Sequence, residues 1–526
     1  MNHPKTGRSA AAFLALFLLF ALTTLLWLRL NKAPPNWDDA WYLSNSLTLY
    51  DAWTDGGLVG FASRFLAALG FKAPLITALP LPFYFVFGRR WHAAYLVNVV
   101  AMAILFGAVW AIGKRLRNAR TGLIAVHIAG TMPLMYGLSR WYLVEYPLAA
   151  FAAVAFWLVL LASTAEGLLT TYALGLVCGV GLLLKADFPL FLAPAMVWLL
   201  LRRRDPMRTL LAIAVPAILL AAPWYILHWR ATLQNALSAG FGPSAVIQGT
   251  GAIFSLSAIL KYLAMVANRG LSWYYLALAA AAAVMVVRRR NFAVFRPMAW
   301  LVLWVAPFLV FVFGGNKDVR YIAPVLPAFA IAAACLLDGA AANRRWIGIA
   351  ALVFPVVSLS AISFGWPYAA ADNGYAFRYD PYSWRQDEIL TLVADGALFP
   401  HVGRKTLLIG TDRALFNADN FQLSAVQDRL PLRVETTAYG ERLDQLIAQA
   451  GAAEYFVYKE GGEPESPFFN RRALELRRCL QRSPEWIEIP FGRLLPDGGT
   501  AHVLRRTAAI ANGYQPPARC DNVGHP

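Results

Sequence analysis

The apolar run AAAFLALFLLFALTTLLWL at residues 10–28 sets the fold, and the stretch Trp37-Asp38-Asp39-Ala40-Trp41-Tyr42 follows it closely. The run is long enough to cross a bilayer and longer than the core of a signal peptide, so we expect a retained membrane anchor. The aspartate pair then lies at a membrane surface beside aromatic residues. A solvated loop would suit such residues too, but ionisable groups near a bilayer are costly and favour a functional role.

Composition indicates a polytopic helical membrane protein. Hydrophobic residues make up 59% of the 526 residues, and the mean hydropathy is +0.50. Such values, with recurring apolar runs of spanning length, exclude an ordinary soluble protein. The net charge of +17 comes from 47 Lys and Arg against 30 Asp and Glu. Many basic residues lie in short clusters between apolar runs, which is typical of cytoplasmic loops and argues against nucleic acid as a partner.

Periodic apolar segments predict a mostly α-helical, multi-pass domain over residues 1–364, with about eleven transmembrane helices. Residues 31–90 are amphipathic and interrupted by prolines, so we expect helices lying in the membrane interface there, with the aspartate pair among them. The expected spans are 10–28, 91–113, 121–138, 146–163, 168–184, 188–201, 210–227, 273–287, 298–313, 322–337 and 346–364.

Basic clusters set the expected topology. With about eleven spans they fall on one side, which the positive-inside rule makes the cytoplasm. The N-terminus is then cytoplasmic, and the tail lies outside. The clusters are Lys5 with Arg8, 114–120, 202–208, 288–296, and Arg344 with Arg345.

The tail, residues 365–526, is long enough for a small extracytoplasmic α/β domain. Strand-like and helix-like patterns alternate in it, and no glycine-rich phosphate loop follows the first expected strand, so we assign no nucleotide. The expected strands are 407–410, 432–436 and 454–458, and the expected helices are 441–450 and 468–481.

The four cysteines show no zinc-type spacing with histidine. Cys178 and Cys335 lie in apolar segments and are expected to be core residues. Cys479 and Cys520 lie in the polar tail and could form a disulfide if that tail is exported.

Several ionisable residues converge on the outer side, at the ends of apolar segments. An acidic group there could act as general base toward a hydroxyl, and basic groups could hold a phosphate. A membrane enzyme with both has lipid-linked phosphosugars as its natural substrates. These outer residues are the aspartate pair, Lys72, Arg140, Glu145, Lys185, Lys317 and Arg320.

The order of motifs resembles the polytopic GT-C-type glycosyltransferases that use polyprenyl-phosphate sugars, a superfamily with the lipid A aminoarabinose transferases, the protein O-mannosyltransferases and the rhizobial lipopolysaccharide-core transferases. Asp38-Asp39-Ala40-Trp41-Tyr42 is similar to the Asp-Glu-Ala-x-Tyr motif, and Phe71-Lys72-Ala73-Pro74-Leu75 to the Lys-Pro-Pro-Leu motif. Residues 140–147, 184–189, Pro223-Trp224-Tyr225 and 320–328 resemble further elements in the same order, and the likeness covers about residues 10–340.

The resemblance implies a cavity facing outward, with Asp38 as the base of an inverting reaction. It implies that Lys72 and the Arg320 region bind the lipid phosphate. The chain also departs from the family. The acidic-His pair often found after Pro-Trp-Tyr is missing from residues 241–251, and Phe71 stands where an acidic residue sometimes precedes the family lysine. These departures put in doubt any metal site there, and the acceptor type.

We therefore assign candidate roles as follows. Asp38 is the expected base, and Asp39 either positions it, binds the acceptor or is solvated. Arg140 and Glu145 are too far apart along a helix to need each other, and structural ion pairing suits them as well as substrate contact. The donor-phosphate candidates are Lys72, Lys317, Arg320 and Arg64, and the other substrate-binding candidates are Arg140, Glu145, Tyr321 and Lys185. We assign no metal ligands and no cofactor, and leave a divalent cation open.

The expected function is transfer of a hexose or pentose from a polyprenyl-phosphate donor to a hydroxyl of a cell-envelope acceptor. That acceptor is lipid A or lipopolysaccharide, another glycan, a lipid, or a protein. The expected location is the bacterial inner membrane, among membrane lipids, with the tail in the periplasm. Two alternatives stay open: a transporter or flippase of lipid-linked glycans, and a membrane scaffold whose outer domain binds glycans or proteins.

Overall fold

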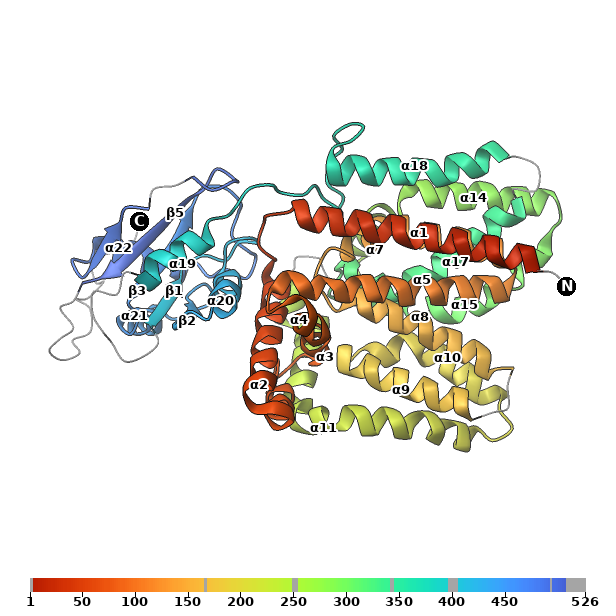
Figure 1. The fold of residues 1–526 in the computed structure, drawn as a ribbon, viewed down its shortest axis with the longest axis horizontal. Coiled ribbons are helices and arrows are strands. Elements are labelled where there is room, and N and C mark those ends of the chain that lie inside the picture. The colour runs from red at the N-terminus through yellow and green to blue at the C-terminus, as the bar shows by residue number, and fades with distance from the viewer. Residues whose placement is uncertain are drawn as a thin grey trace. The chain divides into compact units, whose positions relative to one another are not determined.

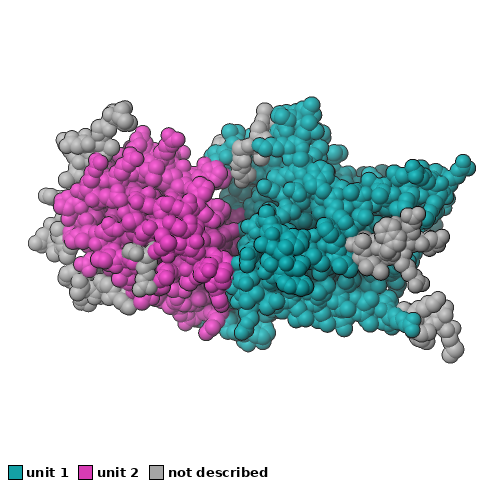
Figure 2. Space-filling view, turned by 90° about the horizontal axis from the view of Figure 1, so that it is seen from above, with its two compact units in different colours: residues 1–30, 52–88, 92–379 teal, residues 31–51, 89–91, 380–526 magenta. Residues whose placement is uncertain are grey.

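The computed structural model describes residues 3–164, 168–247, 254–340, 345–395, 405–491 and 494–507. The chain divides into two compact units, coloured separately in Figure 2. Unit 1 contains residues 1–30, 52–88 and 92–379, and unit 2 contains residues 31–51, 89–91 and 380–526. The division therefore does not follow the sequence, because a segment next to the first helix belongs with the tail.

Every segment expected to span the membrane falls on helix (Figure 1). On length and composition, five helices within the described ranges could each cross a bilayer, or six if a pair bent by 92° counts as one. Other apolar helices are shorter, so the number of eleven spans stays a prediction. The helices of unit 1 are α1 (His3–Leu30), α3 (Leu75–Ala78), α4 (Leu81–Phe87), η1 (Trp91–Tyr95), α5 (Leu96–Leu116), α6 (Ala119–Thr131), α7 (Pro133–Leu138), α8 (Glu145–Ala162), α9 (Leu169–Leu184), α10 (Phe188–Arg202), α11 (Pro206–Phe241), α12 (Pro243–Ile247), α13 (Leu256–Met265), η2 (Val266–Leu271), α14 (Trp273–Arg288), η3 (Phe292–Phe295), α15 (Met298–Val305), α16 (Phe308–Phe313), η4 (Val319–Val325), α17 (Leu326–Ala340) and α18 (Arg345–Phe364).

Prolines break two of the expected spans. Met132 is extended, with φ −63° and ψ 128°, and Pro133 begins α7 at a position where a missing N–H costs no helical hydrogen bond. Pro307 likewise separates α15 from α16. Both breaks leave a short helix, α7 or α16, and a charged residue follows each of them, Arg140 after α7 and Lys317 after α16.

Helix α2 (Trp37–Ala67) runs through both units and is kinked at Gly57, whose φ of 59° and ψ of −147° are accessible to glycine without strain. Its first part, up to Asp51, lies in unit 2. Its last part packs in unit 1, where the indole of Trp224 donates to the Ala68 carbonyl over 3.3 Å. Residues 31–90 thus form one long helix and two short ones.

Small residues let the central helices of unit 1 approach closely. Ala149, Ala150, Ala152 and Ala153 of α8 are fully buried. Such small side chains are what helix packing inside a bilayer favours. Helices α1 and α11 instead expose much of their apolar surface, as a lipid-facing helix does.

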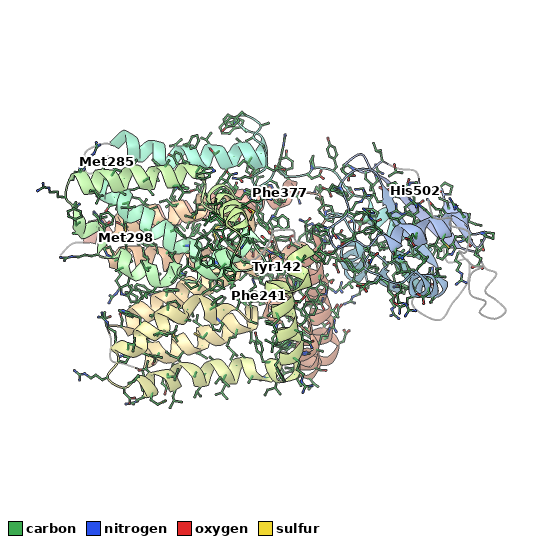
Figure 3. The ribbon with its side chains drawn as sticks, turned by 180° about the vertical axis from the view of Figure 1, so that it is seen from behind. Tyr142, Phe241, Met285, Met298, Phe377 and His502 are labelled. Atoms are coloured by element: carbon green, nitrogen blue, oxygen red, sulfur yellow. The ribbon has the colours of Figure 1, made fainter. Side chains whose placement is uncertain are left out.

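Two polar contacts tie distant segments of unit 1 together. The hydroxyl of Tyr142 donates to the Ile76 carbonyl over 2.6 Å, and the indole of Trp27 donates to the Phe377 carbonyl over 3.1 Å. Tyr142 and Phe377 are labelled in Figure 3. The second contact joins α1 to the segment that follows α18. Residues 365–379 therefore belong to the helical unit.

Unit 2 is built around a sheet of strands β1 (Lys405–Ile409), β2 (Leu432–Thr436), β3 (Tyr455–Glu460), β4 (Trp486–Ile489) and β5 (Thr500–Arg506), in the order β2-β1-β3-β5-β4. The first three pair in parallel, whereas β5 runs antiparallel to β3 and to β4. The three expected strands and two expected helices are present. Helices α19 (Gln386–Asp395) and α20 (Ala418–Gln427) and strands β4 and β5 were not expected, and α21 (Leu443–Gly451) and α22 (Arg472–Arg482) complete the unit.

Alternating side chains of β1 give the sheet two apolar cores. Leu407 and Ile409 face a cluster with Ile389 and Phe421, whereas Leu408 faces a cluster with Leu446. Ala33, far from the tail in sequence, is buried in the first of these clusters. Of the cysteines, Cys178 and Cys335 are free. Cys520 lies outside the described residues, so its disulfide with Cys479 stays a prediction.

A buried ion pair lies at the end of β3, where the fully buried Lys459 ammonium contacts the Asp497 carboxylate. We expect Asp497→Ala to destabilise the protein by about 3–5 kcal/mol, because it leaves a buried charge without its partner. Thermal unfolding of the detergent-purified protein measures this. The double variant Lys459→Met/Asp497→Leu should recover stability, and Asp444→Ala, which breaks an exposed pair with Arg442, serves as control. Equal midpoints for Asp497→Ala and the control would contradict the expectation.

Candidate functional site

The aspartate pair lies in the first turn of α2, within unit 2. Carboxylates are favourable there because the amino end of a helix carries a partial positive charge. Asp38 is partly exposed, whereas Asp39 is only 3% exposed. The more accessible carboxylate is thus Asp38, the residue expected to meet substrate.

A cluster of charged residues gathers in unit 1 around Lys185, in the link between α9 and α10. Its ammonium lies 3.2 Å from Glu145 Oε1 and 3.5 Å from Asp187 Oδ2. The ammonium also lies 4.2 Å from the ring centre of Tyr321. Three of the predicted substrate-binding residues, Glu145, Lys185 and Tyr321, are therefore neighbours.

Arg320 extends the cluster through Asp318. The Arg320 Nε lies 3.1 Å from Asp318 Oδ2, and the hydroxyl of Tyr375 donates to both oxygens of that carboxylate over 3.0 and 3.1 Å. Asp318 also accepts the backbone N–H of Arg320 over 3.0 Å, and so begins η4. Asp318, the residue that caps η4, therefore also orients the Arg320 guanidinium.

The environment of this cluster changes its acid–base behaviour. Burial disfavours charge on Lys185, but Asp187 and Glu145 outweigh it and raise the pKa of that ammonium. Burial raises the pKa of the Asp187 carboxyl, which Lys185 offsets only in part. Burial also raises the pKa of the Tyr375 hydroxyl well above its usual value. Lys185 therefore stays charged at neutral pH and Tyr375 stays a hydrogen-bond donor.

Two carboxylate oxygens of the cluster have unused hydrogen-bonding capacity. Glu145 is 2% exposed, and its Oε2 accepts no hydrogen bond from any described residue. The same holds for Asp187 Oδ1, although the Asp187 side chain is 32% exposed. A buried acceptor without a partner is unusual, which makes these oxygens suited to a substrate hydroxyl or to water.

Arg140 lies apart from Glu145, in an aromatic cage of unit 1. Its guanidinium carbon is 3.8 Å from the ring centre of Tyr136 and 5.4 Å from that of Trp27, and its Nη1 donates to the Ser363 hydroxyl over 2.5 Å. Cation–π contacts of this kind stabilise a buried guanidinium. Arg140 and Glu145 thus do not act as an ion pair.

Lys317 has a different set of partners from its neighbour Arg320. Its side chain is 2% exposed, and its ammonium donates to the carbonyls of Val312 and Gly314 over 2.7 and 2.6 Å. Lysine commonly satisfies the last carbonyls of a helix in this way, here those of α16. Its role at a donor phosphate stays a prediction.

The other predicted residues are divided between the units. Lys72 precedes α3 and lies 5.9 Å from the ring centre of Phe71, and Arg64 is in the last turn of α2. Both belong to unit 1, with Arg320 and Lys185, whereas Asp38 and Asp39 belong to unit 2. The expectation that base and cations share one cavity stays a prediction.

Sequence reasoning missed three members of the cluster. Asp187 and Asp318 each lie two residues from a predicted cation, and that spacing could have identified them. Tyr375 is distant in the chain from its partner Asp318, and no local pattern identifies it. Within the described ranges no three His, Cys, Asp or Glu side chains are grouped as a metal site requires.

Comparison with known proteins gives one matching family model and several solved structures of similar fold. Residues 71–229 match the family model of dolichyl-phosphate-mannose-protein mannosyltransferases. The ArnT structures from Cupriavidus metallidurans, apo and bound to undecaprenyl phosphate, have TM-scores of 0.60 and 0.59 at 16% and 15% identity. Each match covers 96% of this chain and 100% of the ArnT chain. The chain has the GT-C glycosyltransferase fold.

This GT-C fold confirms the resemblance drawn from the motifs. The apolar helices of spanning length in the described residues agree with a multi-pass membrane protein. The oligosaccharyltransferase of Archaeoglobus fulgidus, solved with zinc and sulfate, is less similar, with a TM-score of 0.49 at 15% identity over 84% of this chain and 68% of that one. No curated protein with a similar sequence was found.

The Lys185 cluster should hold unit 1 together. We expect Lys185→Ala to lower stability by about 3 kcal/mol, the low end for breaking a buried pair, because Lys185 itself is 22% exposed. Thermal unfolding in detergent measures the change, with Lys261→Ala, an exposed lysine on α13, as control. If both variants unfold at the same temperature, the cluster has no structural role.

Proposed function

We propose that this protein transfers a sugar from a polyprenyl-phosphate donor to a hydroxyl of a cell-envelope acceptor, at the outer face of the membrane. One observation carries the proposal: the GT-C fold extends over 96% of the chain, with an aspartate pair opening α2. The acceptor is lipid A or lipopolysaccharide, another glycan, or a protein. The expected membrane is the bacterial inner membrane, with the tail in the periplasm.

The donor is held through its phosphate. ArnT of Cupriavidus metallidurans was solved with undecaprenyl phosphate bound, and a lipid phosphate of that kind suits a chain with the same fold. We assign the phosphate to Lys72 and Arg320, with Arg64 and Lys317 as further candidates. Their positive charge stabilises the leaving phosphate as its bond to the sugar breaks.

The acceptor is activated by Asp38. Its carboxylate takes the proton of the acceptor hydroxyl while that oxygen attacks the anomeric carbon of the sugar. The new bond forms on the face opposite the phosphate, and the phosphate leaves with the electron pair of the broken bond. The anomeric configuration is therefore inverted.

The charge balance around Lys185 suggests how the remaining residues divide their roles. Glu145, Asp187 and Asp318 bring three negative charges to the two positive charges of Lys185 and Arg320. A phosphate at Arg320 would compete with Asp318, whereas a sugar hydroxyl could donate to the unused oxygen of Glu145. We therefore assign Glu145, Lys185 and Tyr321 to the sugar, and Arg140 to a supporting role.

Asp38→Asn should abolish transfer, with kcat falling by about 10²–10⁴-fold, the usual contribution of a general base. The measurement uses purified protein in detergent, a synthetic polyprenyl-phosphate sugar and an envelope glycolipid fraction as acceptor. The control is Asp55→Asn, an exposed aspartate on the same helix. Full activity of Asp38→Asn would remove the proposed base. If the protein were a flippase, the wild type and both variants would leave the donor chemically unchanged in detergent.

Lys72→Met and Arg320→Met should each raise KM for the donor by about 10- to 100-fold, because a hydrogen bond to a charged group contributes about 1.5–3 kcal/mol. The KM for the acceptor should stay the same. Lys114→Met, an exposed lysine at the end of α5, is the matched control. A donor KM equal to that of the control would exclude either residue from the phosphate site.

A further inference from the structure

The segment that carries the predicted base is part of the carboxyl-terminal unit. The backbone N–H of Lys32 donates to the Asp380 carbonyl over 2.6 Å, and the Asp380 N–H donates to Asn31 Oδ1 over 2.9 Å. Further along, the Asn420 amide donates to the Pro35 carbonyl. With Ala33 buried in the apolar core of the sheet, the chain is fixed to this unit up to the start of α2.

A further contact within unit 2 lies next to the predicted base, Asp38. The indole N–H of Trp37, the residue before Asp38, donates to Asp412 Oδ1 over 2.7 Å. A hydrogen bond to a carboxylate is shorter and stronger than one between neutral groups. Asp412 therefore holds the indole of Trp37, the first residue of α2.

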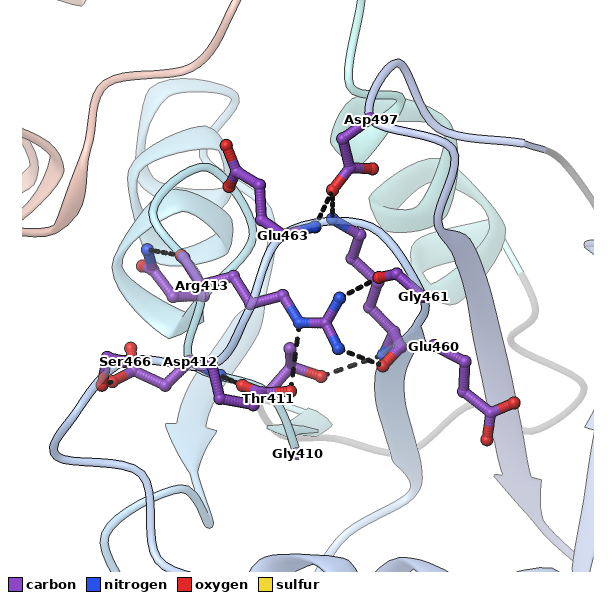
Figure 4. Close-up of polar contacts among 12 residues, drawn as sticks. Gly410, Thr411, Asp412, Arg413, Glu460, Gly461, Glu463, Ser466 and Asp497 are labelled. Atoms are coloured by element: carbon purple, nitrogen blue, oxygen red, sulfur yellow. Dashed lines mark hydrogen bonds and ion pairs between the residues drawn. The ribbon is translucent and has the colours of Figure 1, made fainter.

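Asp412 is itself held firmly at the carboxyl end of β1 (Figure 4). Its backbone N–H donates to Glu465 Oε2 over 2.7 Å, and its carbonyl accepts the Ser466 N–H over 2.7 Å. The Ser466 hydroxyl donates to the second carboxylate oxygen, Oδ2. Both oxygens of Asp412 are thus engaged, one by the tail and the other by Trp37.

The residues on either side of Asp412 join the ends of two parallel strands. Thr411 Oγ1 accepts the Lys459 N–H over 2.9 Å. The buried Arg413 guanidinium contacts Glu465 over 3.1 Å and donates to the carbonyls of Lys459 and Gly461 (Figure 4). These contacts restrict the loop after β1. The loop therefore holds Asp412, the hydrogen-bond acceptor of Trp37, in a fixed position.

The far end of the same helical segment is also anchored within unit 2. Asp51 accepts two hydrogen bonds from Arg89, over 2.6 and 2.5 Å, and a third from Arg429 over 3.0 Å. Arg89 also donates to the carbonyls of Val426 and Gln427 at the end of α20. Residues 37–51 are therefore held at both ends.

The charge environment of Tyr439 agrees with a carboxylate group around Asp38. Burial comes first in raising the pKa of the Tyr439 hydroxyl, and the charges of Asp412, Asp419 and Asp38 add to it. The side chain of Tyr439 is half exposed. Asp38 and Asp412 thus both act on the Tyr439 hydroxyl.

We propose that the carboxyl-terminal α/β unit positions the base, with Asp412 as the positioning residue that holds the start of α2 through the indole of Trp37. This inference rests on the proposed function, since it assumes that Asp38 is the base. Misplacing a reacting group by about 1 Å can reduce a rate by about 100-fold, so such a mount has a direct catalytic value.

The experiment is a double-mutant cycle of Trp37→Phe and Asp412→Ala in the full-length protein. Each single variant should lower kcat by about 10- to 100-fold and leave KM for the polyprenyl-phosphate donor unchanged. The double variant should lose no more than the larger single loss, because both changes remove the same hydrogen bond. Asp412→Asn keeps an acceptor oxygen and should restore part of the rate.

Controls separate positioning from general loss of structure. Trp486→Phe makes the same change in the other core of the sheet, and Asp444→Asn removes an exposed carboxylate of the same unit. Both should keep full kcat. Trp37→Phe leaves the network around Arg413 intact, so its thermal midpoint should stay near that of the wild type even where Asp412→Ala loosens the loop.

The outcomes distinguish this inference from the proposed function. Full kcat in Trp37→Phe and Asp412→Ala, with an inactive Asp38→Asn, would overturn the positioning role alone. Losses that multiply in the double variant would also overturn it, because the two residues would then act separately. A fully active Asp38→Asn would overturn the proposed function itself.

Discussion

Charged side chains at the ends of apolar helices need partners, and this constraint shapes the protein. Lys185 lies between two apolar helices and is neutralised by Glu145 and Asp187. Arg320 is paired with Asp318, and Lys317 is satisfied by helix carbonyls. Without such partners, each charge would oppose the burial of the helix that carries it. The polar groups of unit 1 therefore gather where helices end.

The sequence predicts the helices of unit 1 well, because apolar run length is a local property. The breaks at Pro133 and Pro307 also depend on local sequence, but each proline lies inside an apolar run long enough to be taken as one span. In the tail, strand and helix patterns located β1, β2 and β3. Strands β4 and β5 were not predicted, because polar and apolar residues alternate only weakly along them.

The candidate site was less predictable, because its members come from distant segments. Glu145, Lys185, Tyr321 and Arg320 were chosen for their place at helix ends, and the structure brings them together. Which cation pairs with which carboxylate depends on how helices pack, and sequence spacing carries no information on that. Tyr375 and Asp412 are clearer cases still, since each acts on a residue remote in sequence.

Residues 31–51 and 89–91 belong to the unit formed by the end of the chain. Synthesis proceeds from the amino end, so α2 emerges long before β1 and its loop exist. During that interval Ala33 has no core to enter and Trp37 has no carboxylate to meet. The start of α2 can therefore reach its place in unit 2 only after the last part of the chain has been made and folded.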